Sequence, residues 1–216
     1  MIAIVDYGMG NLRSAQKAFE FVGHNAVLTD DPAEIAAADG VVLPGVGAFK
    51  DCIDGLTERG LVPVVKEAAA SGKPFLGICV GLQLLFDYSE EGEGAAGLGI
   101  FPGRVLRFPP ASESGMKVPH MGWNRILKTD SPASGELLRY TREQPYAYFV
   151  HSYYAQPEDE ALVLAHCEYS ISFPAIVGRG NVFATQFHPE KSQQDGLAIL
   201  KAFGNRVTDG AKVAWN

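Results

Sequence analysis

The segment of residues 73–86, KPFLGICVGLQLLF, constrains the fold more than any other part of the chain. Its short apolar run is closed by Gly77-Ile-Cys79-Val-Gly81, after which apolar residues return at helical spacing. This pattern predicts a buried strand, a sharp turn and a helix. Because glycines flank Cys79, the turn matches a nucleophile elbow, which presents one reactive side chain above the edge of a parallel sheet.

Cys79 would then stand at the N-terminus of a helix. The helix dipole favours the thiolate there, and the thiolate is the nucleophilic form of cysteine. The backbone N–H of Val80 could donate to the oxyanion that forms when a carbonyl is attacked. A buried structural thiol is the alternative, because free cysteines are among the most buried residues. Taken alone, this segment supports both interpretations about equally.

A second glycine-rich loop, PGVGAF at residues 44–49, follows a short apolar run. Its glycines permit peptide orientations that are closed to other residues. In an elbow enzyme the second oxyanion donor comes from a neighbouring loop at a strand end, so the N–H groups of Val46, Gly47 and Ala48 are candidates. The alternative is a plain strand-to-helix turn.

The sequence His188-Pro189-Glu190 follows the apolar run at residues 182–187. A thiol nucleophile needs an imidazole within hydrogen-bond reach, and the imidazole needs an acceptor on its other nitrogen. We therefore expect Cys79, His188 and Glu190 to form a catalytic triad. The alternative is an exposed histidine in a turn. The remaining histidines lack this context of a strand end and a carboxylate: His24, His120, His151 and His166.

Strands and helices are expected to alternate as far as residue 88, which predicts an α/β fold with a parallel, doubly wound sheet. Beyond residue 100 the period becomes alternating, and Gly180-Asn181 predicts a hairpin, so the C-terminal half should be mixed or antiparallel. It would extend the same sheet or form a second layer. We expect one domain over residues 1–207 and a tail over 208–216. Strands are expected at residues 1–5, 26–29, 40–43, 74–78, 103–108, 117–127, 147–154, 162–168, 175–179 and 182–187, and helices near 12–22, 31–37, 48–56, 61–70, 80–86 and 195–207.

Composition excludes several classes of protein. A formal net charge of -7 argues against a nucleic-acid surface. The three scattered cysteines argue against a disulfide framework and a zinc site, so we expect no metal and a cytoplasmic location. Arg13 occupies the third glycine position of a dinucleotide fingerprint that would begin at Gly8, so no cofactor is expected. No apolar run approaches the roughly 20 residues of a membrane helix.

Three motifs, GICVGLQLL, PGVGAF and FHPEKS, together resemble the class I, or triad, glutamine amidotransferase family. Within it, residues 6–11, 118–124 and 148–153 are similar to the glutaminase subunits of imidazole glycerol phosphate synthases. The resemblance covers residues 6–192. It implies a flavodoxin-like α/β fold and hydrolysis of glutamine to glutamate and ammonia through a thioester on Cys79. It also implies that a (β/α)8-barrel cyclase subunit receives the ammonia in histidine biosynthesis.

The resemblance also implies roles for individual residues. It implies that the substrate-binding residues are Gln83, Glu91, His151 and Ser152. It implies that the partner-facing residues are Asn11, Trp123, Tyr148 and Lys191. From the residues alone, Gln83 could instead satisfy a backbone group, and Glu91 could be a solvated loop acid. The partner-facing positions could equally be core aromatics and solvated polar groups.

Two other functions remain open from the residues. The same triad would serve a free-standing cysteine hydrolase, such as a peptidase or a γ-glutamyl hydrolase. A non-catalytic, chaperone-like protein with an inert elbow cysteine is the third possibility. Since the chain lacks a phosphate-binding motif, an amidotransferase of this kind should depend on a partner that binds the acceptor. We then expect residues 44–49 to be a switch that the partner controls.

Overall fold

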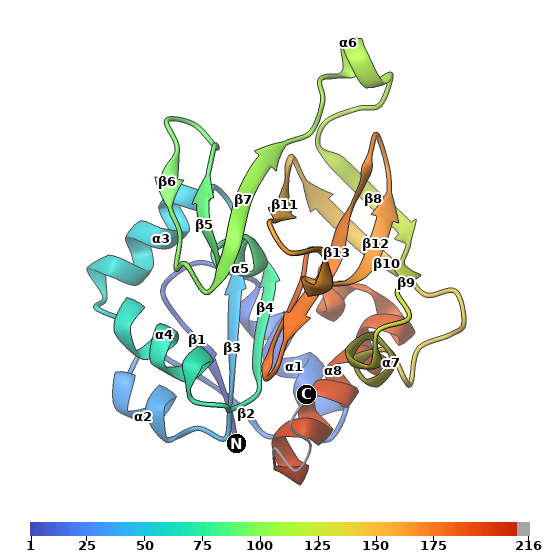
Figure 1. Cartoon of the computed structure of the whole chain (residues 1–216). Coiled ribbons are helices and arrows are strands. Elements are labelled where there is room, and N and C mark those ends of the chain that lie inside the picture. The colour runs from blue at the N-terminus through green and yellow to red at the C-terminus, as the bar shows by residue number, and fades with distance from the viewer. Residues whose placement is uncertain (211–216) are drawn as a thin grey trace.

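The computed structural model describes residues 1–210 of the chain, and its centre is an eight-stranded sheet of order β2-β1-β3-β4-β14-β13-β12-β9 (Figure 1). The first five strands in this order are parallel, and the last three are antiparallel to their neighbours. The strands are β1 (Ile2–Val5), β2 (Ala26–Thr29), β3 (Gly40–Gly45), β4 (Phe75–Cys79), β14 (Val182–Thr185), β13 (Ser172–Arg179), β12 (Val163–Glu168) and β9 (Leu127–Lys128).

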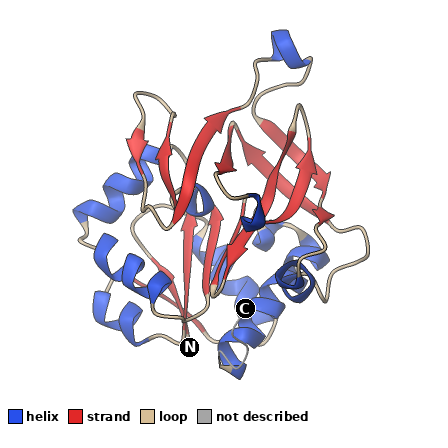
Figure 2. Ribbon diagram, viewed as in Figure 1, coloured by secondary structure: helices blue, strands red, loops and turns tan. Residues whose placement is uncertain are grey.

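Helices cover both faces of the parallel strands, which explains why β1, β3 and β4 are apolar throughout (Figure 2). On one face lie α1 (Leu12–Phe21) and α8 (Gln193–Asp209), and on the other α2 (Pro32–Ala37), α3 (Phe49–Glu58) and α4 (Val62–Ala70). Phe19 of α1 meets Phe203 of α8 with 6.0 Å between ring centroids. The Asp31 side chain caps α2 by accepting from the N–H of Ala33 at 2.8 Å.

Two smaller sheets stand above the carboxyl ends of the parallel strands (Figure 1). One has four strands, β11 (Tyr153–Pro157), β7 (Phe101–Arg107), β5 (Phe86–Ser89) and β6 (Ala95–Ala96), and the other pairs β10 (Tyr146–His151) with β8 (His120–Arg125). The short helical elements are α5 (Val80–Gln83), α6 (Ala111–Ser114), α7 (Pro132–Leu137), η1 (Glu160–Leu162) and η2 (Pro189–Lys191). These two sheets cover the carboxyl-terminal edge of the parallel strands.

The α/β fold with a parallel sheet and a mixed C-terminal half is confirmed, including the hairpin between β13 and β14. Both expected outcomes for the second half occur, because β12 to β14 extend the central sheet while β7, β8, β10 and β11 form separate ones.

The helix expected after Cys79 is wrong in length. α5 is a single turn, and Phe86 begins β5 instead of completing an apolar helix face. Beyond Gln83 the backbone bonds elsewhere: the Leu84 carbonyl accepts from Leu98 N at 2.7 Å, and the Leu85 carbonyl accepts from Ile100 N at 2.8 Å. These non-local bonds compete with the helix, and no periodicity reveals them.

Three further expectations need correction. The strand expected at residues 147–154 is two strands, β10 and β11, which part at Ser152 and belong to different sheets. The short helices α6 and α7 were not expected. The last helix, expected to end near residue 207, continues to Asp209, and residues 211–216 of the expected tail lie outside the described part. Among residues 1–210, no helix has the length and apolarity to cross a membrane.

Candidate active site

The turn after β4 is a nucleophile elbow, as predicted. Cys79 has φ 57° and ψ -112°, a conformation that costs a non-glycine residue about 1–3 kcal/mol and that recurs at functional sites. A Cβ on Gly81 would lie 1.9 Å from the Leu43 carbonyl oxygen, and one on Gly77 would lie 2.8 Å from the Gly81 oxygen. The glycines therefore let the backbones of β3, β4 and α5 pack in direct contact. This close packing fixes the position of Cys79 in the turn.

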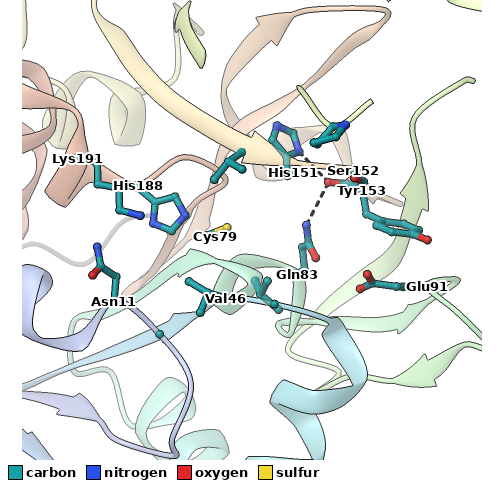
Figure 3. A pocket seen from close by; sticks show the side chains of 15 residues that line it. Asn11, Val46, Cys79, Gln83, Glu91, His151, Ser152, Tyr153, His188 and Lys191 are labelled. Atoms are coloured by element: carbon teal, nitrogen blue, oxygen red, sulfur yellow. Dashed lines mark hydrogen bonds between the residues drawn. The ribbon is translucent and has the colours of Figure 1, made fainter. Parts of the chain in front are cut away.

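His188 and Glu190 lie beside the elbow, at the end of β14. His188 Nδ1 is 2.8 Å from Glu190 Oε1, and their side chains are only 3% and 1% exposed. Because a carboxylate only accepts, Nδ1 carries the proton and Nε2 is left for the neighbouring Cys79 sulfur (Figure 3). Burial lowers the pKa of His188, but its interactions with Cys79 and Glu190 outweigh burial and raise the pKa to about 10. The arrangement thus favours a protonated imidazolium beside Cys79.

Asn11 supports the same carboxylate. Its Nδ2 donates to Glu190 Oε1 at 3.1 Å, the oxygen that also faces His188. Although Asn11 is the N-cap residue of α1, its side chain makes no capping bond there. Asn11 was expected to face a partner, and that role stays a prediction; in the structure its amide supports the carboxylate of the candidate triad.

The loop of residues 44–49 lies beside Cys79 and is tied down at three points. Tyr7 donates its hydroxyl to the Pro44 carbonyl at 2.6 Å, Cys52 Sγ donates to the Val46 carbonyl at 3.3 Å, and Glu91 Oε2 accepts from Phe49 N at 2.7 Å. In a trans peptide the N–H points away from the C=O, so the N–H of Gly47 points away from Cys52. The N–H of Val80, in the first turn of α5, has no partner within that helix.

The other two cysteines are poor nucleophiles. Burial raises the pKa of Cys52 to about 11, and burial raises that of Cys167 to about 12. Both thiols are therefore protonated near neutral pH, and only thiolates attack readily. Of the three, Cys79 alone lines the pocket described next.

A pocket of about 580 Å³ opens over the elbow and is large enough for an amino acid (Figure 3). It joins the candidate nucleophile and base to predicted oxyanion, substrate and partner-facing residues. Its lining includes Asn11, Val46, Gly47, Cys79, Val80, Gln83, Glu91, Pro119, His151, Ser152, Tyr153, His188 and Lys191. Trp123 and Tyr148 are absent from this lining.

Gln83 and His151 converge on one backbone carbonyl in the pocket wall. Tyr153 O accepts from Gln83 Nε2 at 3.1 Å and faces His151 Nδ1 at 2.8 Å (Figure 3). Gln83 Nε2 also donates to Gln186 Oε1 at 3.2 Å, so both of its N–H groups are used. The interpretation of Gln83 as a partner for a backbone group is therefore confirmed for its nitrogen, and a contact with substrate would have to use Oε1.

His151, implied by the resemblance to bind substrate, lines the pocket, but its ring is bonded within the protein. His151 Nε2 faces His120 Nδ1 at 3.1 Å, and His120 Nε2 faces Asn124 Nδ2 at 3.3 Å, so both His151 nitrogens are engaged inside the protein. Burial lowers the pKa of His120 to about 4 and that of His151 to about 3. Both rings are therefore uncharged near neutral pH, and His151 remains in the pocket wall as a proposed substrate contact.

The predicted partner-facing residues fall into two places. Trp123 of β8 and Tyr148 of β10 pair across the two strands, with 6.1 Å between their ring centroids. Trp123 is 47% exposed. Asn11 and Lys191 flank His188 at the pocket (Figure 3). The interpretation of Trp123 as a core aromatic is thus wrong. No group of histidine, cysteine or carboxylate side chains suited to a metal is found in residues 1–210.

Sequence reasoning missed several buried polar residues that support this site. Tyr7, Gln186 and Ser192 are all buried. Gln186 is polar within an otherwise apolar run, which is a usable signal for a buried hydrogen bond. Tyr7 and Ser192 could not be assigned this role from the sequence, because Tyr7 bonds to the Pro44 carbonyl and Ser192 accepts from Tyr148 N, both far along the chain.

Comparison with known proteins agrees with this geometry. Residues 3–206 match the family model "Glutamine amidotransferase class-I". The chain is 57% identical over 208 residues to the imidazole glycerol phosphate synthase subunit HisH of Syntrophotalea carbinolica, covering 95% of this chain and 100% of the relative. It is 52% identical to the subunit of that name from Moorella thermoacetica, covering 95% of each. A crystal structure of a glutamine amidotransferase shares the fold, with a TM-score of 0.71 and 19% identity over 94% of this chain and 100% of the other.

Proposed function

The chain belongs to the class I glutamine amidotransferase family, and we infer from this membership and its HisH relatives that it is the glutaminase subunit of imidazole glycerol phosphate synthase. It hydrolyses glutamine to glutamate and ammonia for histidine biosynthesis. The observation that carries the chemistry is the buried His188–Glu190 contact of 2.8 Å beside a cysteine held in a strained elbow.

We propose the following roles for the site residues. The Cys79 thiolate attacks the side-chain amide carbon of glutamine, and the N–H groups of Val80 and of the Val46–Gly47 segment stabilise the oxyanion. The His188 imidazolium protonates the departing ammonia, which leaves a thioester on Cys79. His188 then takes a proton from water, which attacks the thioester and releases glutamate. Glu190 keeps the ring in the required tautomer.

The pocket wall supplies contacts for the rest of the substrate. Glu91 lines the pocket with one carboxylate oxygen bonded to Phe49 N, so its charge is available to the α-amino group of glutamine. Ser152 and Gln83 Oε1 are the neutral polar groups proposed to fix the substrate's orientation. No cofactor is needed for this chemistry.

We further propose that a (β/α)8-barrel cyclase subunit receives the ammonia. The relatives are described as subunits, which requires a partner. Exposed apolar side chains gather on β8 and β10, where Met121 is 62% exposed and Trp123 stands opposite Tyr148. Exposed aromatic and methionine side chains of this kind are typical of protein interfaces. The three free cysteines fit a reducing cytoplasm.

The decisive experiment measures glutamine hydrolysis by the purified chain, by its complex with the cyclase, and by the complex with acceptor nucleotide. We expect stepwise stimulation, because a partner that docks near Asn11, Lys191 and Trp123 can bias the 44–49 loop toward donating an N–H to the oxyanion. One such donor is worth roughly 10²- to 10³-fold in rate. Full activity in the isolated chain would support a free-standing hydrolase instead, and no activity in any state would support the non-catalytic protein.

A further inference from the structure

The base of the triad is tied to strand β10 by a closed ring of three hydrogen bonds. The His188 N–H donates to the Tyr148 carbonyl at 3.1 Å, and the Tyr148 N–H donates to Ser192 Oγ at 2.9 Å. The Ser192 hydroxyl in turn donates to the His188 carbonyl at 2.6 Å. Four of the six groups in this ring are backbone, and the other two are both supplied by the Ser192 hydroxyl.

Ser192 is placed where serine usually has another task. It is the N-cap residue of α8, and an N-cap serine normally accepts from a backbone N–H in the first helical turn. Here the side chain makes no capping bond, and the residue is 1% exposed. A hydroxyl has one proton to donate, and Ser192 gives it to the residue that carries the base.

The ring joins β10, which carries Tyr148 and pairs with β8, the strand that carries the exposed Trp123. Tyr148 pairs with Trp123 across β10 and β8, and the N–H of Tyr146, two residues earlier, donates to Asp195 Oδ2 at 3.0 Å. Two side chains at the start of α8, Ser192 and Asp195, thus accept from the N–H groups of Tyr148 and Tyr146 in β10. Of these two anchors, only Ser192 also bonds to His188.

We propose that Ser192 is a positioning residue for the glutaminase reaction: its hydroxyl fixes the His188 backbone to β10 and so sets the imidazole against the Cys79 sulfur. The proposal rests on the triad proposed above. It explains why a buried hydroxyl leaves its helix uncapped. It also provides a direct mechanical link between the Trp123–Tyr148 surface and the base.

The test compares Ser192→Ala with a matched control, Ser134→Ala, in the full chain. Ser134 is also 1% exposed, but its hydroxyl has no hydrogen-bond partner among residues 1–210. The readout is the rate at which iodoacetamide alkylates Cys79 as a function of pH, with the modified peptide identified by mass. Thermal unfolding of each variant is recorded alongside it.

We expect Ser192→Ala to raise the pH midpoint of Cys79 alkylation and to slow the reaction at neutral pH on the order of ten- to a hundredfold, the scale of a misplaced catalytic group. Ser134→Ala should match the wild type. A folded Ser192→Ala variant with the wild-type profile would overturn the proposal. A loss of thermal stability with an unchanged profile would do so as well, because it would show a purely structural role.

If Ser192→Ala does not fold, Ser192→Cys fills the site with a slightly larger thiol and weakens both hydrogen bonds, and the same rise in the Cys79 midpoint is required of it. Peptide mapping separates Cys79 from the new thiol. Failure of this inference is distinct from failure of the proposed function, because the triad itself is tested by the loss of glutaminase activity in Cys79→Ala.

Discussion

The nucleophile and the base are held in place by different physical means. Cys79 is positioned by backbone packing within residues 43–81, where Gly81 lies against the Leu43 carbonyl with no room for a side chain. His188 is positioned by polar contacts, some local, from Glu190 and Ser192, and some from distant parts of the chain, from Asn11 through Glu190 and from Tyr148. Disturbing the backbone packing around Cys79 should cost stability together with activity. Disturbing the polar contacts that position His188 should cost mainly activity.

The largest effect is expected at the nucleophile itself. Cys79→Ala should abolish glutamine-dependent synthesis in the complex, because no thioester can form. Synthesis from added ammonium salts should continue, since the cyclase chemistry lies elsewhere. Both rates are measured on the same preparation, with Cys167→Ala as a control that should retain glutamine-dependent activity. Glutamine turnover by Cys79→Ala would end the triad hypothesis.

The next effect is expected at the base. His188→Asn should slow thioester formation by on the order of 10²- to 10⁴-fold, the range for a positioned general base. Glu190→Gln should slow it less, because orientation and charge support are lost while the proton acceptor remains. Single-turnover kinetics measure both. A normal His188→Asn enzyme alongside a crippled His120 or His151 variant would show that the base is misassigned.

A third change tests whether the backbone packing around Cys79 also contributes to the stability of the fold. Gly81→Ala adds a methyl group 1.9 Å from the Leu43 carbonyl oxygen, so β3 or α5 must shift. Overpacking of this kind typically costs about 1–3 kcal/mol. Gly135→Ala is the control, because a Cβ there meets nothing within 4 Å and alanine favours the helix. Urea unfolding of both variants should show a loss only for Gly81→Ala; equal midpoints would mean that the elbow tolerates a side chain.

The smallest expected effect comes from the neutral histidine pair. The pKa of His120 is about 4 and that of His151 about 3, both below the unfolded value near 6.5. Below pH 6.5 the unfolded chain therefore binds protons that the folded chain refuses. The stability that the pair contributes is complete above pH 6.5 and is lost as pH falls toward 4.

Urea unfolding at several pH values measures this contribution. Between pH 6.5 and pH 4, the free energy of unfolding of His120→Gln should fall by less than that of the wild type. The difference should be on the order of 1–3 kcal/mol, at about 1.4 kcal/mol for each unit of pKa difference. An unchanged slope would mean that the pair is protonated in the folded protein.

The different ways in which Cys79 and His188 are positioned also explain which features could be predicted from the sequence. The elbow was predictable because its glycines, its cysteine and the flanking apolar runs are adjacent in the chain. The His188–Glu190 contact was predictable for the same reason, since the two residues are only two positions apart. The length of α5 and the break at Ser152 were not predictable, because backbone bonds to distant segments decide them.

The supporting polar contacts were hidden for a related reason. The resemblance implies that His151 binds substrate, but nothing in the sequence shows that its ring bonds to His120, which is 31 positions away. Ser192 ends the FHPEKS motif, but the motif does not reveal that the hydroxyl bonds to Tyr148 and to the His188 backbone. Such contacts have no period, so only the folded structure identifies them.

The most direct test of the central claim is covalent labelling by a glutamine-analogue electrophile, followed by peptide mass mapping. The wild-type complex should carry one adduct, on Cys79, with Cys52 and Cys167 unmodified because their buried thiols are protonated. His188→Asn should label at least tenfold more slowly, since the thiolate loses its imidazolium partner. Labelling of Cys52 or Cys167 instead, or an undiminished rate in His188→Asn, would contradict the account of Cys79 and His188 as nucleophile and base.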